Sequence, residues 1–165
     1  MVTDDDGRVW MMTGDEGSMD KDGYLTITGR IKDIIIRGTP SPPPQHPLTL
    51  GGENILPLEI ENILFSHPDI AQASVVAIAD EKYGEVVGAF VERMPHAPQI
   101  PKITREQVKS EVAKKLARYK VPRYVFFLGE DGIPESWPVT ASGKIRKVEL
   151  RSWGDGAVKS GRIKN

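Results

Sequence analysis

Residues 138–147 (PVTASGKIRK) contain the side chains best suited to chemistry. Small and turn-forming residues dominate this segment, so it is expected to leave the core and to project Lys144 outward. The hydroxyls of Thr140 and Ser142 and the Gly143 backbone could donate to an oxyanion, and a lysine on its flexible stem is a movable positive charge. The segment favours contact with an anion, although the same residues also fit a solvated basic turn ahead of a helix.

Other kinds of site are disfavoured by the composition. The chain has no cysteine, which excludes disulfides, thiolate metal sites and cysteine nucleophiles. His46, His67 and His96 lie near prolines without the spacing of metal ligands, so they are given no metal or catalytic role. The 22 Lys and Arg residues balance the 23 Asp and Glu residues, so no overall field favours nucleic acid or an anionic membrane.

Targeting features are also missing from the sequence. No apolar run approaches the length of a membrane span, and residues 1–6 (MVTDDD) are too acidic to begin a secretory signal. The final residues (RIKN) are not a peroxisomal tripeptide signal. A cytoplasmic protein is therefore the default expectation.

The elements that must position the lysine segment follow the order β, α, β, β, α, β. Proline suits a first helical turn at Pro57, and Thr104 with Gln107 forms a capping box for a second helix. Strands are predicted at residues 9–12, 24–28, 34–36, 70–78, 85–91 and 124–128, and helices at 57–65 and 105–118, with a helical turn or two at 147–153. The sequence predicts an α+β fold with a small sheet, three-stranded or slightly larger, flanked by helices. Residues 154–165 are expected to form a disordered basic tail.

Several phrases occur in an order that resembles one family. They are residues 10–15 (WMMTGD), 20–25 (DKDGYL), 29–33 (GRIKD), 51–61 (GGENILPLEIE) and 138–147. Together they resemble the final third of the adenylate-forming, or AMP-binding, superfamily, which includes acyl-CoA synthetases, luciferases and adenylation domains of peptide synthetases. Residues 67–70 (HPDI) and 79–85 (ADEKYGE) resemble the acyl-CoA synthetase branch in particular.

The resemblance implies two parts in the chain. Residues 1–31 would be a β-rich remnant of the amino-terminal AMP-binding domain, and residues 32–153 the carboxy-terminal lid domain. The complete enzyme would activate a fatty or other carboxylic acid with ATP to acyl-AMP, and would then transfer the acyl group to coenzyme A. Mg²⁺ would be held by ligands outside this chain. Without the larger domain, this fragment alone is expected to be inactive.

The resemblance also assigns roles to single residues. Lys144 would stabilise negative charge while acyl-AMP and pyrophosphate form. Asp15 and Arg30 would contact the ribose of ATP, or in the case of Arg30 the phosphates, although a turn residue and a strand-end surface charge are the simpler alternatives. Lys32 would be the hinge about which the small domain rotates between the two half-reactions. Its alternative is an ordinary exposed strand residue.

The same family pattern places a coenzyme A channel at Gly52, Glu53 and Asn54, where glycine would let the thiol arm approach the backbone. Helix capping is the alternative role for these three residues, and both can hold at once. Near the start of the following helix, Glu59 and Glu61 are expected only to favour the helix dipole. Trp137 and Trp153 flank the Lys144 segment and are expected to pack against it rather than to bind substrate.

Two departures from the family pattern lead to further hypotheses. Residues 39–50 (TPSPPPQHPLTL) insert five prolines where the family continues directly into Gly-Glu-Asn. We interpret this stretch as translated non-coding sequence, with Met1 as an internal start; an SH3- or WW-like ligand is the functional alternative. A different class of function also stays open, in which the chain is a non-catalytic interaction module that docks on a separate partner.

Overall fold

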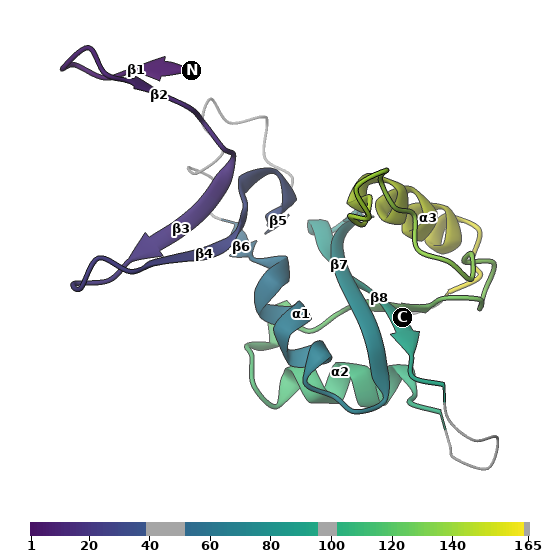
Figure 1. Ribbon diagram of the computed structural model, residues 1–165. Helices are drawn as coiled ribbons and strands as arrows, with labels where there is room; N and C mark the ends of the chain where they lie inside the picture. Colours follow the sequence, from purple (N-terminus) through teal and green to yellow (C-terminus); the bar gives the residue numbers. More distant parts are fainter. Residues whose placement is uncertain (39–51, 96–101, 164–165) are drawn as a thin grey trace.

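The computed structural model of the chain describes residues 1–38, 52–95 and 102–163 (Figure 1). The proline-rich stretch predicted at 39–50 lies outside these residues, as do His46 and His96. The chain forms a packed α/β unit, from which the amino-terminal segment projects as two β-hairpins.

The two amino-terminal hairpins are antiparallel. Strand β1 (Val2–Thr3) pairs with β2 (Val9–Trp10), and β3 (Asp15–Met19) pairs with β4 (Leu25–Arg30). The strands predicted near residues 9–12 and 24–28 are present, but each pairs with a neighbour that the sequence did not indicate. Both hairpins close through tight Asp-rich turns, in which Asp4 accepts from the backbone of Arg8, and Asp20 from that of Tyr24.

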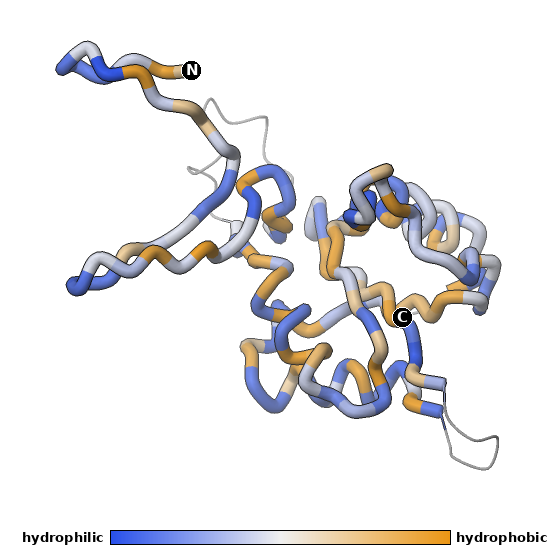
Figure 2. Tube along the Cα trace, viewed as in Figure 1, coloured by the Kyte–Doolittle hydropathy of each residue, from blue (hydrophilic) through white to orange (hydrophobic). Residues whose placement is uncertain are grey.

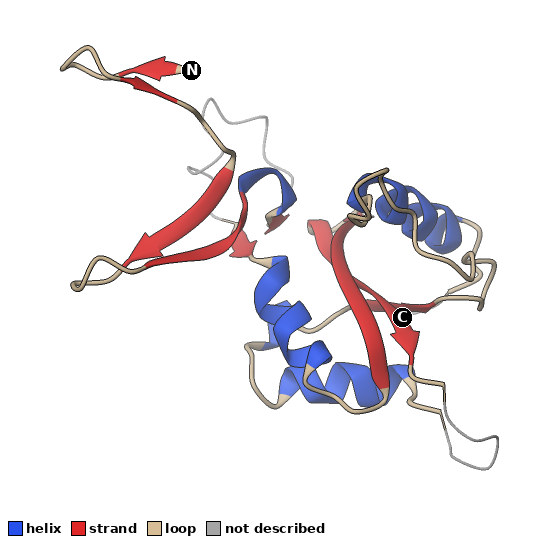
Figure 3. Cartoon of the chain, viewed as in Figure 1, coloured by secondary structure: helices blue, strands red, loops and turns tan. Residues whose placement is uncertain are grey.

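The packed unit is built on a five-stranded sheet. Its strands are β5 (Ile35–Arg37), β6 (Glu53–Ile55), β7 (Ile70–Asp80), β8 (Gly84–Arg93) and β9 (Tyr124–Phe127). The order is β6-β5-β8-β7, and β9 runs parallel to β8 (Figure 3). The prediction of a small α+β sheet, three-stranded or slightly larger, is confirmed, with five strands in the described residues.

Helices cover both faces of this sheet. Along β7, Val75 and Ala77 belong to one buried cluster with residues of α1 (Pro57–Phe65) and α2 (Arg105–Ala113). The alternate residues Val76 and Ile78 belong to a second cluster with α3 (Lys147–Lys159). The alternation shows that α1 and α2 lie on one face and α3 on the other. Among the described residues, no helix combines the length and apolar character needed to cross a bilayer.

Helix α3 corrects the prediction of a disordered tail from residue 154. The helix continues to Lys159, and beyond it Ile163 is buried. Gly154 and Gly156 lie inside this helix, although glycine disfavours helices. In the structure a Cβ at Gly154 would lie 2.4 Å from the Ile78 side chain, so the glycine lets α3 approach the sheet closely. Tertiary packing therefore outweighs the local preference.

Helix α2 is shorter than the predicted 105–118. The Thr104 capping box is present, with Thr104 Oγ1 accepting from Gln107 N at 3.2 Å. The helix ends at Ala113, and a separate 3-10 helix, η2 (Arg118–Lys120), follows. Leu116 still packs against the buried cluster of α1 and α2, so its apolar spacing predicted its burial correctly but not its secondary structure.

Candidate functional site

The Lys144 segment is a tight turn closed by its own backbone. Val139 and Ile145 form an antiparallel bridge, and Thr140 N donates to Lys144 O at 2.8 Å. Gly143 has a φ of +77°, a conformation that favours glycine, and its N–H donates to Thr140 O at 2.9 Å. This N–H was predicted to donate to an anion, but in the structure it already donates to a carbonyl of the same turn.

The side chains of the turn divide into two kinds. The hydroxyls of Thr140 and Ser142 lie 2.9 Å apart, and Thr140 Oγ1 also accepts from Lys144 N, so both hydroxyls hold the turn together. Lys144 itself is exposed, and within residues 1–38, 52–95 and 102–163 its ammonium has no hydrogen bond or ion pair. The turn therefore presents one unpaired positive charge on a fixed backbone.

Hydrogen bonds and apolar packing both hold the base of the turn in place. Arg146 N donates to Pro138 O at 2.7 Å, and Trp137 Nε1 donates to Glu92 Oε2 at 2.5 Å. Trp137, Trp153 and Ile145 pack against the buried cluster under α3. Both tryptophans thus pack against the same cluster as Ile145 of the turn.

Asp15 and Arg30 face each other on the β3–β4 hairpin. They are register partners of the two strands, and Arg30 Nε lies 3.3 Å from Asp15 Oδ1. Their side chains keep 33% and 50% of their surface exposed. The structure thus brings together the two residues expected to contact one ribose, on an element separate from the Lys144 turn.

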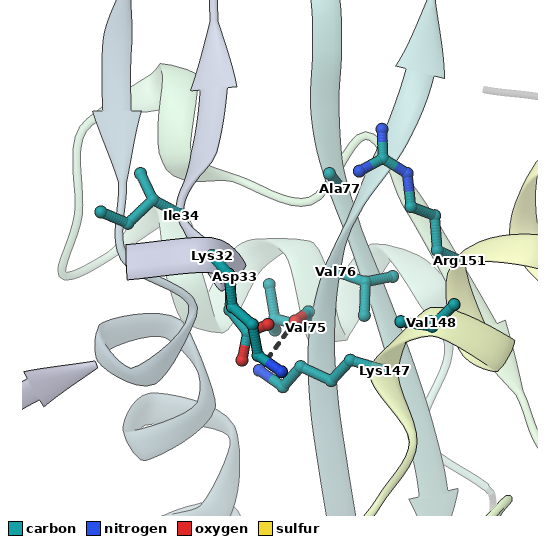
Figure 4. A pocket seen from close by; sticks show the side chains of 9 residues that line it. All are labelled: Lys32, Asp33, Ile34, Val75, Val76, Ala77, Lys147, Val148 and Arg151. Atoms are coloured by element: carbon teal, nitrogen blue, oxygen red, sulfur yellow. Dashed lines mark hydrogen bonds between the residues drawn. The ribbon is translucent and has the colours of Figure 1, made fainter. Parts of the chain in front are cut away.

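Lys32 lies in the 3-10 helix η1 (Ile31–Asp33), which connects β4 to β5. It is exposed, and the simpler alternative of a strand position does not apply, because the backbone turns here. With Asp33, it lines a small hollow whose other side is formed by Lys147 and Arg151 of α3 (Figure 4). The segment that joins the amino-terminal hairpins to the packed unit therefore lies directly beside the helix that follows the Lys144 turn.

Glu53 and Asn54 begin β6, which pairs with β5 and leads into α1. Both side chains are exposed, and Gly52 precedes them at a narrow point, where a Cβ would lie 3.3 Å from the Ile36 side chain. The N-cap of α1 is Leu56, without a side-chain capping bond. The alternative capping role for the Gly-Glu-Asn segment is therefore wrong.

A wide hollow beside this segment was missed at the sequence level. Four cations line it together with Glu53 and two tyrosines; the cationic and aromatic members are Arg37, Lys82, Tyr83, Arg118, Tyr119 and Arg123. We call it the cationic hollow, and its volume is about 790 Å³. Residues 118–123 (RYKVPR) contain three basic residues and a tyrosine, and this cluster of charge could have indicated the hollow.

Part of the cationic hollow is fixed by internal contacts. The Arg37 guanidinium lies 3.9 Å above the Tyr83 ring, and Arg123 pairs with Asp80 at 2.9 Å. A hydrogen bond from Lys82 lowers the pKa of Tyr83 below its usual value. Arg37 and Arg123 are thus held in place before any ligand arrives, an arrangement suited to phosphate groups.

Glu59 and Glu61 do more than favour the helix dipole, contrary to expectation. Glu59 pairs with Lys120 at 2.7 Å, and Glu61 pairs with Lys147 at 2.7 Å. Each carboxylate therefore joins α1 to a distant segment of the chain.

A metal site is not formed by the described residues, because no three His, Asp or Glu side chains among them gather closely enough to hold an ion. His67, the one histidine in the described part of the chain, uses Nδ1 to accept from Asp69 N at 3.2 Å.

The fold and this site define a small α+β domain that presents a lysine turn and a cationic hollow. The chain belongs to the AMP-binding enzyme C-terminal domain family, whose model matches residues 59–144. This finding confirms the family resemblance. The structural likeness extends beyond the matched range, because solved relatives cover about nine-tenths of the chain.

Individual relatives point to ligases. The acyl-CoA ligase sidI of Aspergillus fumigatus is 48% identical over 92% of this chain. ATP-bound MatB from Rhodopseudomonas palustris superposes with a TM-score of 0.71 at 30% identity, covering 93% of this chain and 25% of its own. MenE from Bacillus subtilis, an o-succinylbenzoate CoA synthetase solved with its acyl-adenylate, gives 0.68 at 32% identity, covering 90% and 25%. This chain spans only 23% of the length of sidI.

Proposed function

We propose that this chain is the carboxy-terminal part of an acid–CoA ligase, which converts a fatty or other carboxylic acid, ATP and coenzyme A into an acyl-CoA through acyl-AMP. The observation that carries this proposal is the exposed Lys144 ammonium, unpaired within the described residues, on a turn closed by backbone and hydroxyl hydrogen bonds. The acyl-CoA ligase relatives support it.

In the first half-reaction, Lys144 meets the acyl carboxylate and the α-phosphate of ATP. Negative charge builds up there while the carboxylate oxygen attacks phosphorus and pyrophosphate leaves. A preplaced cation stabilises that charge without reorganising at the moment of reaction. Within the described residues the Lys144 ammonium has no ion pair, so none has to be broken before it meets the substrate.

The nucleotide is held by a second element. Asp15 can accept from both ribose hydroxyls, and Arg30 lies against the same carboxylate, within reach of the same sugar. Residues 1–31 would be the end of the amino-terminal domain in this proposal, which explains why this pair lies on a hairpin outside the packed unit. Metal ions that accompany ATP would be held by that larger domain.

The second half-reaction needs a different face of the lid domain. Rotation about Lys32 would withdraw Lys144 and bring Gly52, Glu53 and Asn54 to the acyl-adenylate. The cationic hollow opens beside Glu53, and its arginines and Lys82 would bind the phosphates of coenzyme A while the thiol arm passes the narrow point at Gly52.

The test is a fusion of this chain behind the amino-terminal domain of a relative such as sidI of Aspergillus fumigatus. Pyrophosphate release is measured with ATP, Mg²⁺ and a panel of carboxylic acids, and thioester formation is measured separately from supplied acyl-AMP and coenzyme A. Lys144→Ala is expected to slow adenylation by about 100-fold, the effect of removing one preplaced charge donor. Thioester formation should change by less than about threefold, because Lys144 has left the site by then.

Matched controls make this test decisive. Lys159→Ala removes an equally exposed lysine at the far end of α3 and should change neither step. Equal losses in both steps with Lys144→Ala would contradict the assigned role. A fusion in which this chain packs on the amino-terminal domain but pyrophosphate is never released would favour the interaction module instead. The support for that alternative is the exposed apolar side chains of the amino-terminal hairpins.

A further inference from the structure

Helix α3 follows the Lys144 turn directly and is tied to the rest of the domain by two basic residues. Lys147 and Arg151 are one helical turn apart on the same face, and both line the hollow beside Lys32 and Asp33 (Figure 4). Each pairs with a carboxylate that also accepts from a backbone N–H. These two carboxylates therefore add polar contacts to the apolar packing of α3, as does Asp155 of the same helix, which accepts from Ala79 N at 2.9 Å.

Glu61 makes the more buried of the two connections. Its Oε1 atom accepts from Lys147 Nζ at 2.7 Å and from Val75 N at 2.8 Å. Lys147 donates in addition to Val75 O at 3.1 Å. The Glu61 side chain is 12% exposed and that of Lys147 26% exposed, so solvent screens this contact less than it would a surface ion pair. One carboxylate thus joins α1, β7 and α3.

Glu85 makes the second connection. Its Oε2 atom accepts from Ile36 N at 3.0 Å, and its Oε1 atom accepts from Arg151 at 2.7 Å. Ile36 lies in β5, the strand that follows the Lys32 segment. Since Arg151 is 46% exposed, this connection is the weaker of the two.

The Glu61 connection lies close to the reacting lysine in sequence. Lys147 begins α3 three residues after Lys144, and the intervening Arg146 closes the turn through Pro138 O. The N-cap residue of α3, Arg146, makes no side-chain capping bond, so capping does not stabilise the start of this helix. Instead, the Lys147 ammonium binds Glu61 and Val75 O, and these contacts hold the start of α3 against the sheet.

We propose that Glu61 and Lys147 are positioning residues, which hold the start of α3 on the sheet and so fix the place of the Lys144 turn during adenylation. This inference rests on the proposed function for its catalytic consequence, but the tether itself is a property of the isolated chain. The two consequences can therefore be measured separately.

The tether is tested by amide hydrogen exchange on the 165-residue chain. Lys147→Met removes the ammonium and keeps most of the side-chain volume. The amides of Thr140 and Arg146 should then exchange at least about 10-fold faster, because the turn opens more often. The amide of Val87, in the centre of β8, should keep its protection, since the fold is intact.

Lys120→Met is the matched control for this measurement. Lys120 also pairs with a glutamate of α1 at 2.7 Å and is similarly buried, but it lies on η2, away from the Lys144 turn. It should leave Thr140 and Arg146 unchanged. Unaltered exchange with Lys147→Met, or equal acceleration in both variants, would overturn the tether.

The catalytic consequence is measured in the fusion described above. Glu61→Gln and Lys147→Met should each lower the kcat of adenylation by about 10- to 100-fold, the scale expected when a reacting group is misplaced by a fraction of an ångström to one ångström. The KM for ATP and the thioester step should stay within about twofold, and Lys147→Arg should restore most of the rate because it keeps the ion pair.

A merely structural role would give a different pattern, in which both half-reactions fall together and Lys147→Arg restores neither; that result would overturn the positioning role. A wild-type fusion that never adenylates any acid would count against the proposed function alone, because the exchange measurement on the isolated chain still decides whether the tether exists.

Discussion

The amino-terminal hairpins and the packed unit use similar side chains in opposite ways. In the hairpins, Trp10, Leu25 and Ile27 are between 50% and 60% exposed. In the packed unit, residues of the same kinds, such as Phe126 and Leu64, are fully buried. Figure 2 shows apolar residues of β4 on the hairpin that projects from the packed unit. Within the described residues, the apolar side chains of the packed unit are therefore buried, whereas those of the hairpins stay exposed.

This difference bears directly on function. A two-stranded hairpin is only marginally stable by itself, and a bare apolar surface usually marks a site of contact. The hairpins carry Asp15 and Arg30, whereas the packed unit carries Lys144 and the cationic hollow. In the proposed function these two parts divide one nucleotide site, which a second surface would complete. The chain spans about a quarter of the length of its solved relatives.

The largest expected effect compares one core residue with one hairpin residue. Phe126→Ala should lower the free energy of unfolding by about 3–5 kcal/mol, because it removes a ring stacked 4.5 Å from that of Phe90 and leaves a cavity. Leu25→Ala should change it by less than about 0.5 kcal/mol, because Leu25 has no core to leave. Urea unfolding followed by circular dichroism measures both.

Similar losses for the two variants would mean that the hairpins fold against the packed unit in solution, and the comparison would then fail. Leu64→Ala serves as a second core variant, on the other face of the sheet, and should resemble Phe126→Ala in its effect.

An intermediate effect is expected for charge. The Asp80 side chain is 8% exposed, pairs with Arg123, and accepts from the backbone of Lys82 and Tyr83. Asp80→Ala should cost about 2 kcal/mol, because the Arg123 guanidinium and two backbone N–H groups lose a largely buried acceptor. Asp15→Ala should cost less than about 1 kcal/mol, since its pair with Arg30 is exposed, yet in the fusion it should raise the KM for ATP. A large stability loss with Asp15→Ala would contradict the view that this pair is reserved for a ligand.

Sequence reasoning succeeded where the determinants are local. The Lys144 turn depends on Gly143 and on hydroxyls within four residues of it, and the α2 start depends on Thr104 and Gln107, so both could be predicted from short phrases. The β7 and β8 strands were likewise predictable from their apolar composition between turn residues. The family phrases then supplied roles that no local pattern contains.

Features assembled from distant segments could not be predicted in this way. The cationic hollow combines residues from β5, the β7–β8 turn and the segment around η2, and Glu61 meets Lys147 across 86 positions in the sequence. The length of α3 was missed for the same reason, because the contact of Gly154 with Ile78 exists only once the sheet has formed. Such contacts are set by topology, which a single sequence leaves open.

The smallest expected effect concerns Tyr83, at the edge of the packed unit. A hydrogen bond and the charge of Lys82 lower the pKa of Tyr83, so its phenolate should appear at lower pH than that of unfolded tyrosine. A lowered pKa in the folded state adds stability above the unfolded value, and this contribution is lost as the pH falls through the folded value. Absorbance titration at alkaline pH should show an early phase of phenolate formation. Tyr83→Phe should remove this phase, and Lys82→Met should move it to higher pH. Tyr24→Phe, in the exposed hairpin, should leave it unchanged. If Tyr24→Phe removed that phase instead, the tyrosine with the lowered pKa would lie in the hairpins. The difference between the hairpins and the packed unit would then be reversed.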